Sequence, residues 1–162
     1  MIEFSGFPYP NDLHVVWSLM IVTYPYVTGL VAGAFIVSSL YHVFNRKELW
    51  PIGRFSLVAS LAFMLVATWP LINHLGQPQR ALSIMITPNP SSAMAGFGLA
   101  YNWYLMILLL EVWFVFRKDI VLAARQSRGI KRSIFAALAL WTYDISDQAL
   151  AKDHKIVTVL AA

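Results

Sequence analysis

The chain has 162 residues, of which 59% are hydrophobic and only 12% are charged. A soluble domain averages about 45–50% apolar and about 25% charged residues, so this composition excludes an ordinary soluble enzyme, a disordered protein and a disulfide-rich scaffold. Lys and Arg (12) outnumber Asp and Glu (8), but these charges gather at the ends of long apolar runs, which indicates a membrane protein and argues against nucleic-acid binding.

Three apolar runs are long enough to cross a bilayer as helices, which takes about 20 residues. The first covers residues 13–44 and contains no Asp, Glu, Lys or Arg. The second covers residues 55–72, and the third covers residues 92–116 with Glu111 as its one charged residue. The sequence therefore predicts an all-α integral membrane protein, a helical bundle with three complete transmembrane helices.

The last third of the chain is less regular. Residues 117–155 begin with a strongly basic stretch and are interpreted as a cytoplasmic loop, in which the short apolar segment 133–143 predicts an interfacial helix. A new apolar run then occupies residues 156–162 and predicts the start of a fourth span. We therefore interpret residues 1–162 as a single membrane domain, the N-terminal portion of a larger bundle that needs additional membrane helices.

The distribution of basic residues predicts the orientation of the chain in the membrane. With three spans, the loop 45–54 and everything after Phe116 lie on one side, and the opposite side carries Arg80 alone. Cytoplasmic loops are enriched in Lys and Arg, so the N-terminus is expected outside, in a prokaryotic cytoplasmic membrane. Nine basic residues lie in the loop 45–54 and in residues 117–132: Arg46, Lys47, Arg54, Arg117, Lys118, Arg125, Arg128, Lys131 and Arg132.

The outward loop after the second run holds the most informative polar residues: Asn73, His74, Gln77 and Arg80. Two interpretations are open at this point. The loop is either a structured turn with interfacial anchors, or a polar pocket that binds a carbonyl-bearing, membrane-soluble ligand. In the second interpretation a histidine could relay protons, because its unperturbed pKa lies near neutrality.

The first and third runs each place polar residues inside a span. Tyr24 lies in the outer half of the first run, where Gly29 and Gly33 form a small-xxx-small pair that permits close helix contact. In the third run, Tyr101 and Glu111 share one helical face. A carboxylate inside a span is a functional candidate, although Glu111 could instead snorkel or pair with a basic residue near the cytoplasmic end.

Resident cofactors are not expected in these residues. Without cysteine the chain cannot form an iron–sulfur cluster or a cysteine-ligated zinc site. A membrane b-haem normally needs two axial histidines that face each other at one depth. His14 and His74 could both lie near the outer surface, whereas His42 is near the inner side and His154 is outside the spans, so the spacing of a haem pair is absent. We therefore predict no haem and no metal site.

Three motifs give the chain a resemblance to the polysulfide reductase membrane-subunit family, also called NrfD-like proteins. They are Gly29-Leu-Val-Ala-Gly33 in the first helix, His74-Leu-Gly-Gln-Pro-Gln-Arg80 after the second, and Thr87-Pro-Asn-Pro-Ser-Ser-Ala-Met94 before the third. Their order and spacing cover most of residues 13–116. Two features depart from the family pattern: members usually have eight or more helices, and many carry Asp at the position of His74.

The resemblance implies a helix-bundle subunit that binds a quinone, such as menaquinone or ubiquinone, as an exchangeable substrate near the outer face. Electrons would pass between the quinone and an iron–sulfur subunit, which connects to a catalytic oxidoreductase subunit. The candidate quinone contacts are Tyr24, His74, Gln77, Arg80 and Tyr101, with His74 and Arg80 in the catalytic roles. The alternative is a non-redox bundle, either a membrane anchor or a transporter fragment.

Overall fold

The computed structural model describes residues 18–44, 46–74, 78–87, 89, 91 and 93–162. All regular elements in this part of the chain are helices, which confirms the predicted all-α class. In order they are α1 (Leu19–His42), η1 (Lys47–Leu49), α2 (Trp50–Ala67), α3 (Trp69–His74), η2 (Pro78–Arg80), α4 (Ser83–Ile86), α5 (Ala93–Gln126), α6 (Ile130–Leu138) and α7 (Asp147–Leu160).

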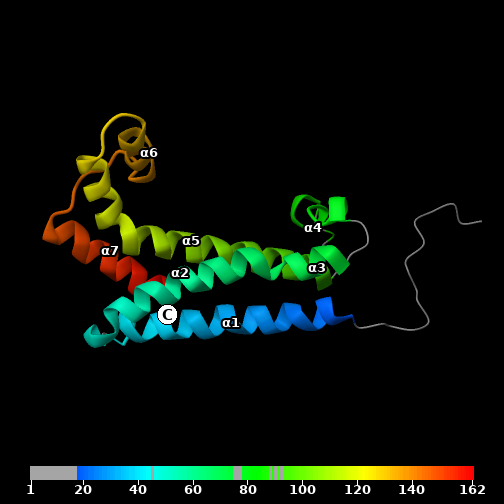
Figure 1. Cartoon of the computed structure of the whole chain (residues 1–162). Helices are drawn as coiled ribbons and strands as arrows, with labels where there is room; N and C mark the ends of the chain where they lie inside the picture. Colours follow the sequence, from blue (N-terminus) through cyan, green and yellow to red (C-terminus); the bar gives the residue numbers. More distant parts are fainter. Residues whose placement is uncertain (1–17, 45, 75–77, 88, 90, 92) are drawn as a thin grey trace, which may run out of the picture.

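Three long helices, α1, α2 and α5, lie lengthwise against one another and form an elongated bundle (Figure 1). Helix α3 continues the direction of α2 at one end of the bundle, where α4 packs on α5. Helices α6 and α7 lie at the opposite end, and α7 packs on α5 and α1. The buried core between the long helices consists of Val31, Leu57, Met64 and Leu108, surrounded by half-buried aromatic and aliphatic side chains.

The second apolar run forms two helices rather than one. Helix α2 begins at Trp50, earlier than the predicted span, with Pro51 in its first turn, where a missing backbone N–H removes no hydrogen bond. It ends at Ala67, and α3 begins at Trp69, again with a proline, Pro70, near its start. Residues 47–74 nevertheless form one continuous helical stretch that is apolar enough to cross a membrane.

Close helix contact in the described structure occurs at a different glycine from the pair we expected. Gly29 and Gly33 are not closely packed, since an added Cβ at either position would meet no atom within 4 Å. A Cβ at the buried Gly53 of α2 would lie 3.0 Å from Cβ of Tyr41 and 3.6 Å from the Ser38 carbonyl oxygen. The absence of a side chain at Gly53 is therefore what lets α1 and α2 approach.

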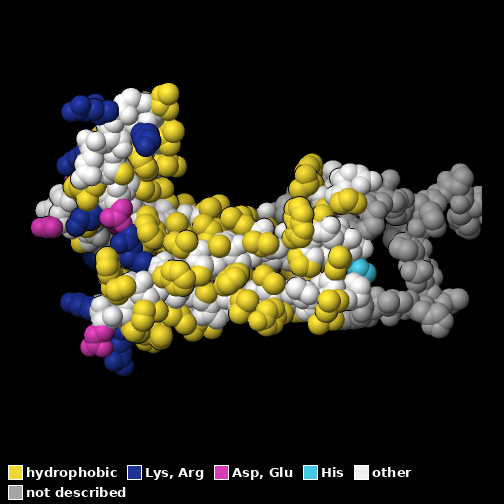
Figure 2. Space-filling view, in the orientation of Figure 1, with side chains coloured by type: hydrophobic (Ala, Val, Ile, Leu, Met, Phe, Trp, Pro, Cys, Tyr) yellow, Lys and Arg dark blue, Asp and Glu magenta, His cyan; other side chains and the backbone are white. Residues whose placement is uncertain are grey.

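Apolar and charged side chains occupy different parts of the bundle surface, as is typical of a membrane protein. Hydrophobic side chains cover its middle, and Lys and Arg gather at the end that carries α6 (Figure 2). Two described stretches, Leu19–His42 and Lys47–His74, have the length and composition to cross a bilayer. Helix α5 is less uniformly apolar, because glycines, tyrosines and Asn102 occupy its first half and charged residues its last turns. It extends to Gln126, beyond the end of the predicted third span at Phe116.

The helices after α5 begin and end at different residues from those predicted. Helix α6 covers Ile130–Leu138, and two consecutive non-glycine residues with positive φ, Leu140 and Trp141, turn the chain after it. Helix α7 begins at Asp147, where the Ser146 hydroxyl accepts a hydrogen bond from the Ala149 backbone N–H. The final apolar run therefore continues a helix that starts nine residues before it.

Candidate functional site

Helix ends meet at the end of the bundle opposite α6. Ser18 precedes the first residue of α1, and His74 is the last residue of α3; Ser18 Oγ and His74 Nδ1 lie within hydrogen-bonding distance, 2.9 Å apart. The side-chain amide of Asn73 donates to the Trp69 carbonyl oxygen within α3 (2.8 Å). The contact with Ser18 holds one ring nitrogen of the exposed His74 and leaves Nε2 available to a ligand.

Aromatic rings connect α1 to the start of α5 near the same end. The rings of Tyr24 and Phe97 meet edge to face with centroids 5.8 Å apart, and the Phe97 ring lies 6.5 Å from the ring of Tyr101. The Tyr101 hydroxyl donates to the Met64 carbonyl oxygen (3.0 Å), whereas the half-buried Tyr24 hydroxyl makes no hydrogen bond to another described residue. Among the described residues, the Tyr24 hydroxyl is therefore available to a ligand, and the Tyr101 hydroxyl has a structural role.

The structure thus describes the side chains of three of the five predicted contact residues. Tyr24 and Tyr101 share Phe97 as a neighbour, a residue that we did not predict as part of the site although helical spacing places it on the face of Tyr101. His74 lies at the end of α3, which packs against α1. Gln77 lies outside the described residues. Arg80 is the last residue of η2, and its side chain also lies outside the described part of the structure.

A second group of polar residues lies at the opposite end, and no motif in the sequence pointed to it. A cavity of about 450 Å³ opens between the ends of α1, α2, α5 and α7. Arg54 of α2 forms an ion pair with Asp119 of α5, and its guanidinium lies 4.2 Å from the ring centroid of Phe116. His42 of α1 and His154 of α7 face each other with ring centroids 6.4 Å apart.

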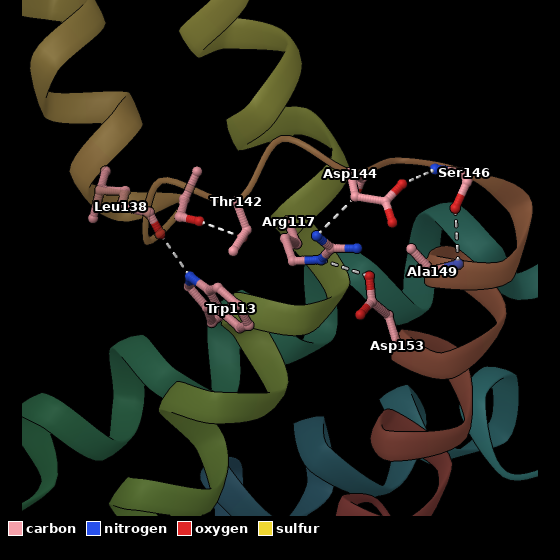
Figure 3. Close-up of polar contacts among 9 residues, drawn as sticks. Trp113, Arg117, Leu138, Thr142, Asp144, Ser146, Ala149 and Asp153 are labelled. Atoms are coloured by element: carbon pink, nitrogen blue, oxygen red, sulfur yellow. Dashed lines mark hydrogen bonds and ion pairs between the residues drawn. The ribbon is translucent and has the colours of Figure 1, made fainter.

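Side chains of α5 donate hydrogen bonds to the segment that contains α6 and α7 (Figure 3). The Arg117 guanidinium donates from Nε to Asp153 Oδ2 (2.7 Å) and from Nη1 to the Asp144 carbonyl oxygen (2.9 Å). The Trp113 indole N–H donates to the Leu138 carbonyl oxygen (2.7 Å). The Ser146 backbone N–H donates to the Asp144 carboxylate (2.9 Å) and holds the pKa of Asp144 below its ordinary value. These contacts fix α6 and α7 relative to α5.

The sequence left two structural roles open for Glu111: extending to the membrane surface, or pairing with a basic residue. The described structure shows neither. The Glu111 side chain is fully buried, and both carboxylate oxygens lack a hydrogen-bond partner among the described residues. Leu108 and Glu111 are both buried on the face of α5 that also carries Tyr104, whose ring meets Phe35 of α1 at 5.7 Å. On α2, the buried Ser60 hydroxyl donates to the Val31 carbonyl oxygen (3.0 Å).

Comparison with known proteins gives one family and several relatives. The family model described as polysulphide reductase, NrfD, matches residues 10–162. A selenate reductase subunit of Mesobacillus selenatarsenatis is 31% identical over 131 residues, which cover 76% of this chain and 29% of the relative. A putative dimethyl sulfoxide reductase membrane subunit of Halobacterium salinarum is 31% identical over 145 residues, 85% of this chain and 28% of that one.

A third relative is more distant. The Hdr-like menaquinol oxidoreductase integral membrane subunit of Archaeoglobus fulgidus is 28% identical over 93 residues, which cover 57% of this chain and 24% of the relative. The chain thus spans less than a third of the length of each of these relatives. No solved structure matches it.

Proposed function

This chain belongs to the polysulphide reductase NrfD family, and on that premise we propose that it interacts with quinone or quinol as a membrane subunit of a respiratory electron-transfer complex. It exchanges electrons with an iron–sulfur subunit, which passes them to or from a catalytic oxidoreductase subunit. The three relatives are named as subunits of reductases or of a menaquinol oxidoreductase, and two of them as membrane subunits, which supports this assignment. Residues 1–162 contain no cysteine, so these residues do not supply the cysteine ligands of a cluster that receives the electrons.

The observation that carries the proposal is the junction of α1, α3 and α5 around His74 and Tyr24. A quinone headgroup offers two carbonyl oxygens, and its two-electron reduction also takes up two protons. His74, held at Nδ1 by Ser18, has Nε2 available for one oxygen, and the Tyr24 hydroxyl is an available donor. Phe97 and the other apolar side chains at this end suit the ring and isoprenoid tail of such a ligand. From the sequence we add Arg80 to the proposed contacts, because a permanent positive charge would stabilise the reduced oxygen.

We expect this junction to face the outside of a prokaryotic cytoplasmic membrane, with three spans formed by α1, α2 with α3, and the first part of α5. The basis is the gathering of Lys and Arg at the α6 end of the bundle. Single cysteines test this cleanly because the chain has none of its own. With an impermeant thiol reagent on intact cells, Ser83→Cys should be labelled and Ser127→Cys should not. The reverse pattern would place the junction on the cytoplasmic side and contradict the proposal.

Substitutions at the junction should slow quinol turnover without preventing assembly. His74→Ala and Arg80→Ala each remove a charged or ionisable hydrogen-bonding group, which is worth roughly 1.5–3 kcal/mol and corresponds to about a 10- to 100-fold loss of turnover. Tyr24→Phe removes a neutral donor worth about 1 kcal/mol and should lower turnover about fivefold. The measurement is quinol oxidation or quinone reduction by the assembled complex.

The matched control is Tyr26→Phe, because Tyr26 lies two residues from Tyr24 on the same helix and is 68% exposed. It should leave turnover within about twofold of the wild type, the range expected for an exposed substitution. If His74→Ala and Tyr24→Phe assembled and behaved like this control, the junction would be a structural turn and not a quinone site.

A further inference from the structure

Buried, unpaired polar groups lie directly beneath the cavity at the α6 end of the bundle. The cavity has a volume of about 450 Å³, and its lining includes Tyr41, His42, Arg54, Val115, Asp153 and His154. His42 is only 4% exposed, and neither of its ring nitrogens has a hydrogen-bond partner among the described residues. An unpaired imidazole that lines a cavity can exchange protons with the solvent that fills it.

The polar groups continue deeper into the bundle on two facing helices. Ser38 lies four residues before His42 on α1, and Glu111 lies four residues before Val115 on α5. Four residues correspond to one helical turn, about 6 Å, so both groups lie one turn below the floor of the cavity. Both are fully buried, and the Ser38 hydroxyl, like the Glu111 carboxylate, has no partner in the described part of the chain.

Burying these polar groups without partners lowers the stability of the fold, and the described contacts show no interaction that compensates for it. An unpaired buried hydroxyl or imidazole loses its hydrogen bonds to water, and a buried carboxylate loses more. Leucine at position 111 would pack on α1 and α2 without this penalty, as Leu108 does one turn away. A titratable side chain without a fixed partner can bind and release a proton, whereas a fixed ion pair would hold it in its charged form.

We propose that His42 and Glu111 form a proton path that leads from the cytoplasmic cavity into the membrane interior. The His42 imidazole takes a proton from water in the cavity and becomes an imidazolium. A proton then passes through bridging water or the Ser38 hydroxyl to the Glu111 carboxylate, which becomes a neutral carboxylic acid, and the imidazole returns to its neutral form. No electron moves in this step, so no oxidant or reductant is required. The path lies at the end of the bundle opposite His74. It rests on the orientation proposed above and does not depend on the proposed quinone site.

The charges around the cavity are balanced in a way that suits proton entry. Arg54 is paired with Asp119, and Arg117 with Asp153, so two of the cations that could repel an incoming proton are neutralised. The remaining titratable or charged groups that face His42 and the cavity come from α1, α5 and α7: Tyr41, Lys118 and His154. His154 is exposed and faces His42, so it lies at the mouth of the path rather than within it.

Labelling with an apolar carbodiimide tests the path without any turnover. Dicyclohexylcarbodiimide adds to a carboxylic acid only in its protonated form, and mass spectrometry locates the adduct. The sample is the assembled complex in sealed vesicles whose two faces are buffered separately. Raising the pH on the cytoplasmic face by two units should lower labelling of Glu111 at least about fivefold, whereas the same change on the outer face should alter it less than about twofold. Glu111→Gln, which removes the acid, identifies the labelled position.

The role of His42 is tested by the speed of the response. After a rapid pH change on the cytoplasmic face, labelling of Glu111 in His42→Phe should follow at least about tenfold more slowly than in the wild type, because a positioned proton carrier accelerates transfer by this much or more. His42→Gln, which keeps a polar side chain but cannot titrate, should behave like His42→Phe. The control His154→Phe should stay within about twofold, as expected for an exposed group at the mouth. Labelling that follows the outer pH, or an absence of labelling at any pH, would overturn the proposal.

Discussion

Replacing Arg117 with methionine is expected to lower the free energy of unfolding by about 3–5 kcal/mol, the usual result of removing one partner of a buried ion pair. Arg117 is 6% exposed, and the Asp153 side chain is 14% exposed. The substitution leaves the Asp153 carboxylate and the Asp144 carbonyl oxygen without their guanidinium donor. The docking of α7 on α5 should therefore be lost first.

The matched control for this substitution is Arg125→Met, two turns further along α5. Arg125 is exposed and makes one hydrogen bond to the described residues, from Nη2 to the Tyr143 carbonyl oxygen (2.7 Å), so its loss should cost about 1 kcal/mol or less. Unfolding of the solubilised complex by a denaturing detergent, followed by tryptophan fluorescence, gives both values. The double variant with Asp153→Leu should recover part of the loss, because it removes the stranded carboxylate. Equal losses for Arg117→Met and Arg125→Met would contradict the structure at this point.

Truncating Leu108 to alanine should destabilise the bundle by about 2–5 kcal/mol, the range for large-to-small changes at buried positions. Leu108 is fully buried between α1, α2 and α5, in the core cluster with Val31, Leu57 and Met64. Lipid tails are as apolar as leucine, so burial away from water is not the source of the effect within a membrane. The loss comes from the cavity and from the dispersion contacts that the surrounding side chains no longer make.

Leu109 provides the comparison, since it is the next residue on the same helix and is 49% exposed. Leu109→Ala should change the unfolding free energy by less than about 0.5 kcal/mol. The same detergent titration measures both variants. If Leu109→Ala were as harmful as Leu108→Ala, the face of α5 that carries Leu109 would also be packed in the complete complex, and the described core would not be the main one.

The all-α class and the positions of the long helices were largely predictable from the sequence, because long uncharged runs are compatible with few structures other than membrane helices. Helix α1 falls inside the run 13–44, and the face shared by Tyr101, Leu108 and Glu111 follows directly from helical spacing. The start of α7 was also predictable in principle: Ser146 is a favourable N-cap residue, and Asp147 places a negative charge in the first turn. We interpreted the segment as part of a cytoplasmic loop because residues 117–155 begin with a strongly basic stretch.

The rest depends on contacts between residues that are distant in the chain. Ser18 and His74 are 56 residues apart, and Arg117 and Asp153 are 36 residues apart, so no local sequence pattern predicts either contact. The consecutive positive φ angles at Leu140 and Trp141 are unfavourable for side chains of this size, and a sequence therefore gives no reason to expect them. Gly53 was overlooked for a related reason, since its closeness to Tyr41 exists only once α1 and α2 have packed.

The length of α5 has a consequence for how the protein sits in its lipid environment. Its 34 residues correspond to about 51 Å at 1.5 Å per residue, against a hydrocarbon thickness of about 30 Å. If α5 spans the membrane as proposed, without tilt and with Ala93 at the outer boundary, about 20 Å of the helix extends beyond the hydrocarbon. Arg117, 24 residues after Ala93, then lies about 36 Å along it, just past the far boundary. Because Arg117 holds α7, a bilayer thicker by several ångströms would draw this ion pair into hydrocarbon. On the proposed topology, the length of α5 therefore matches the subunit to one range of membrane thickness.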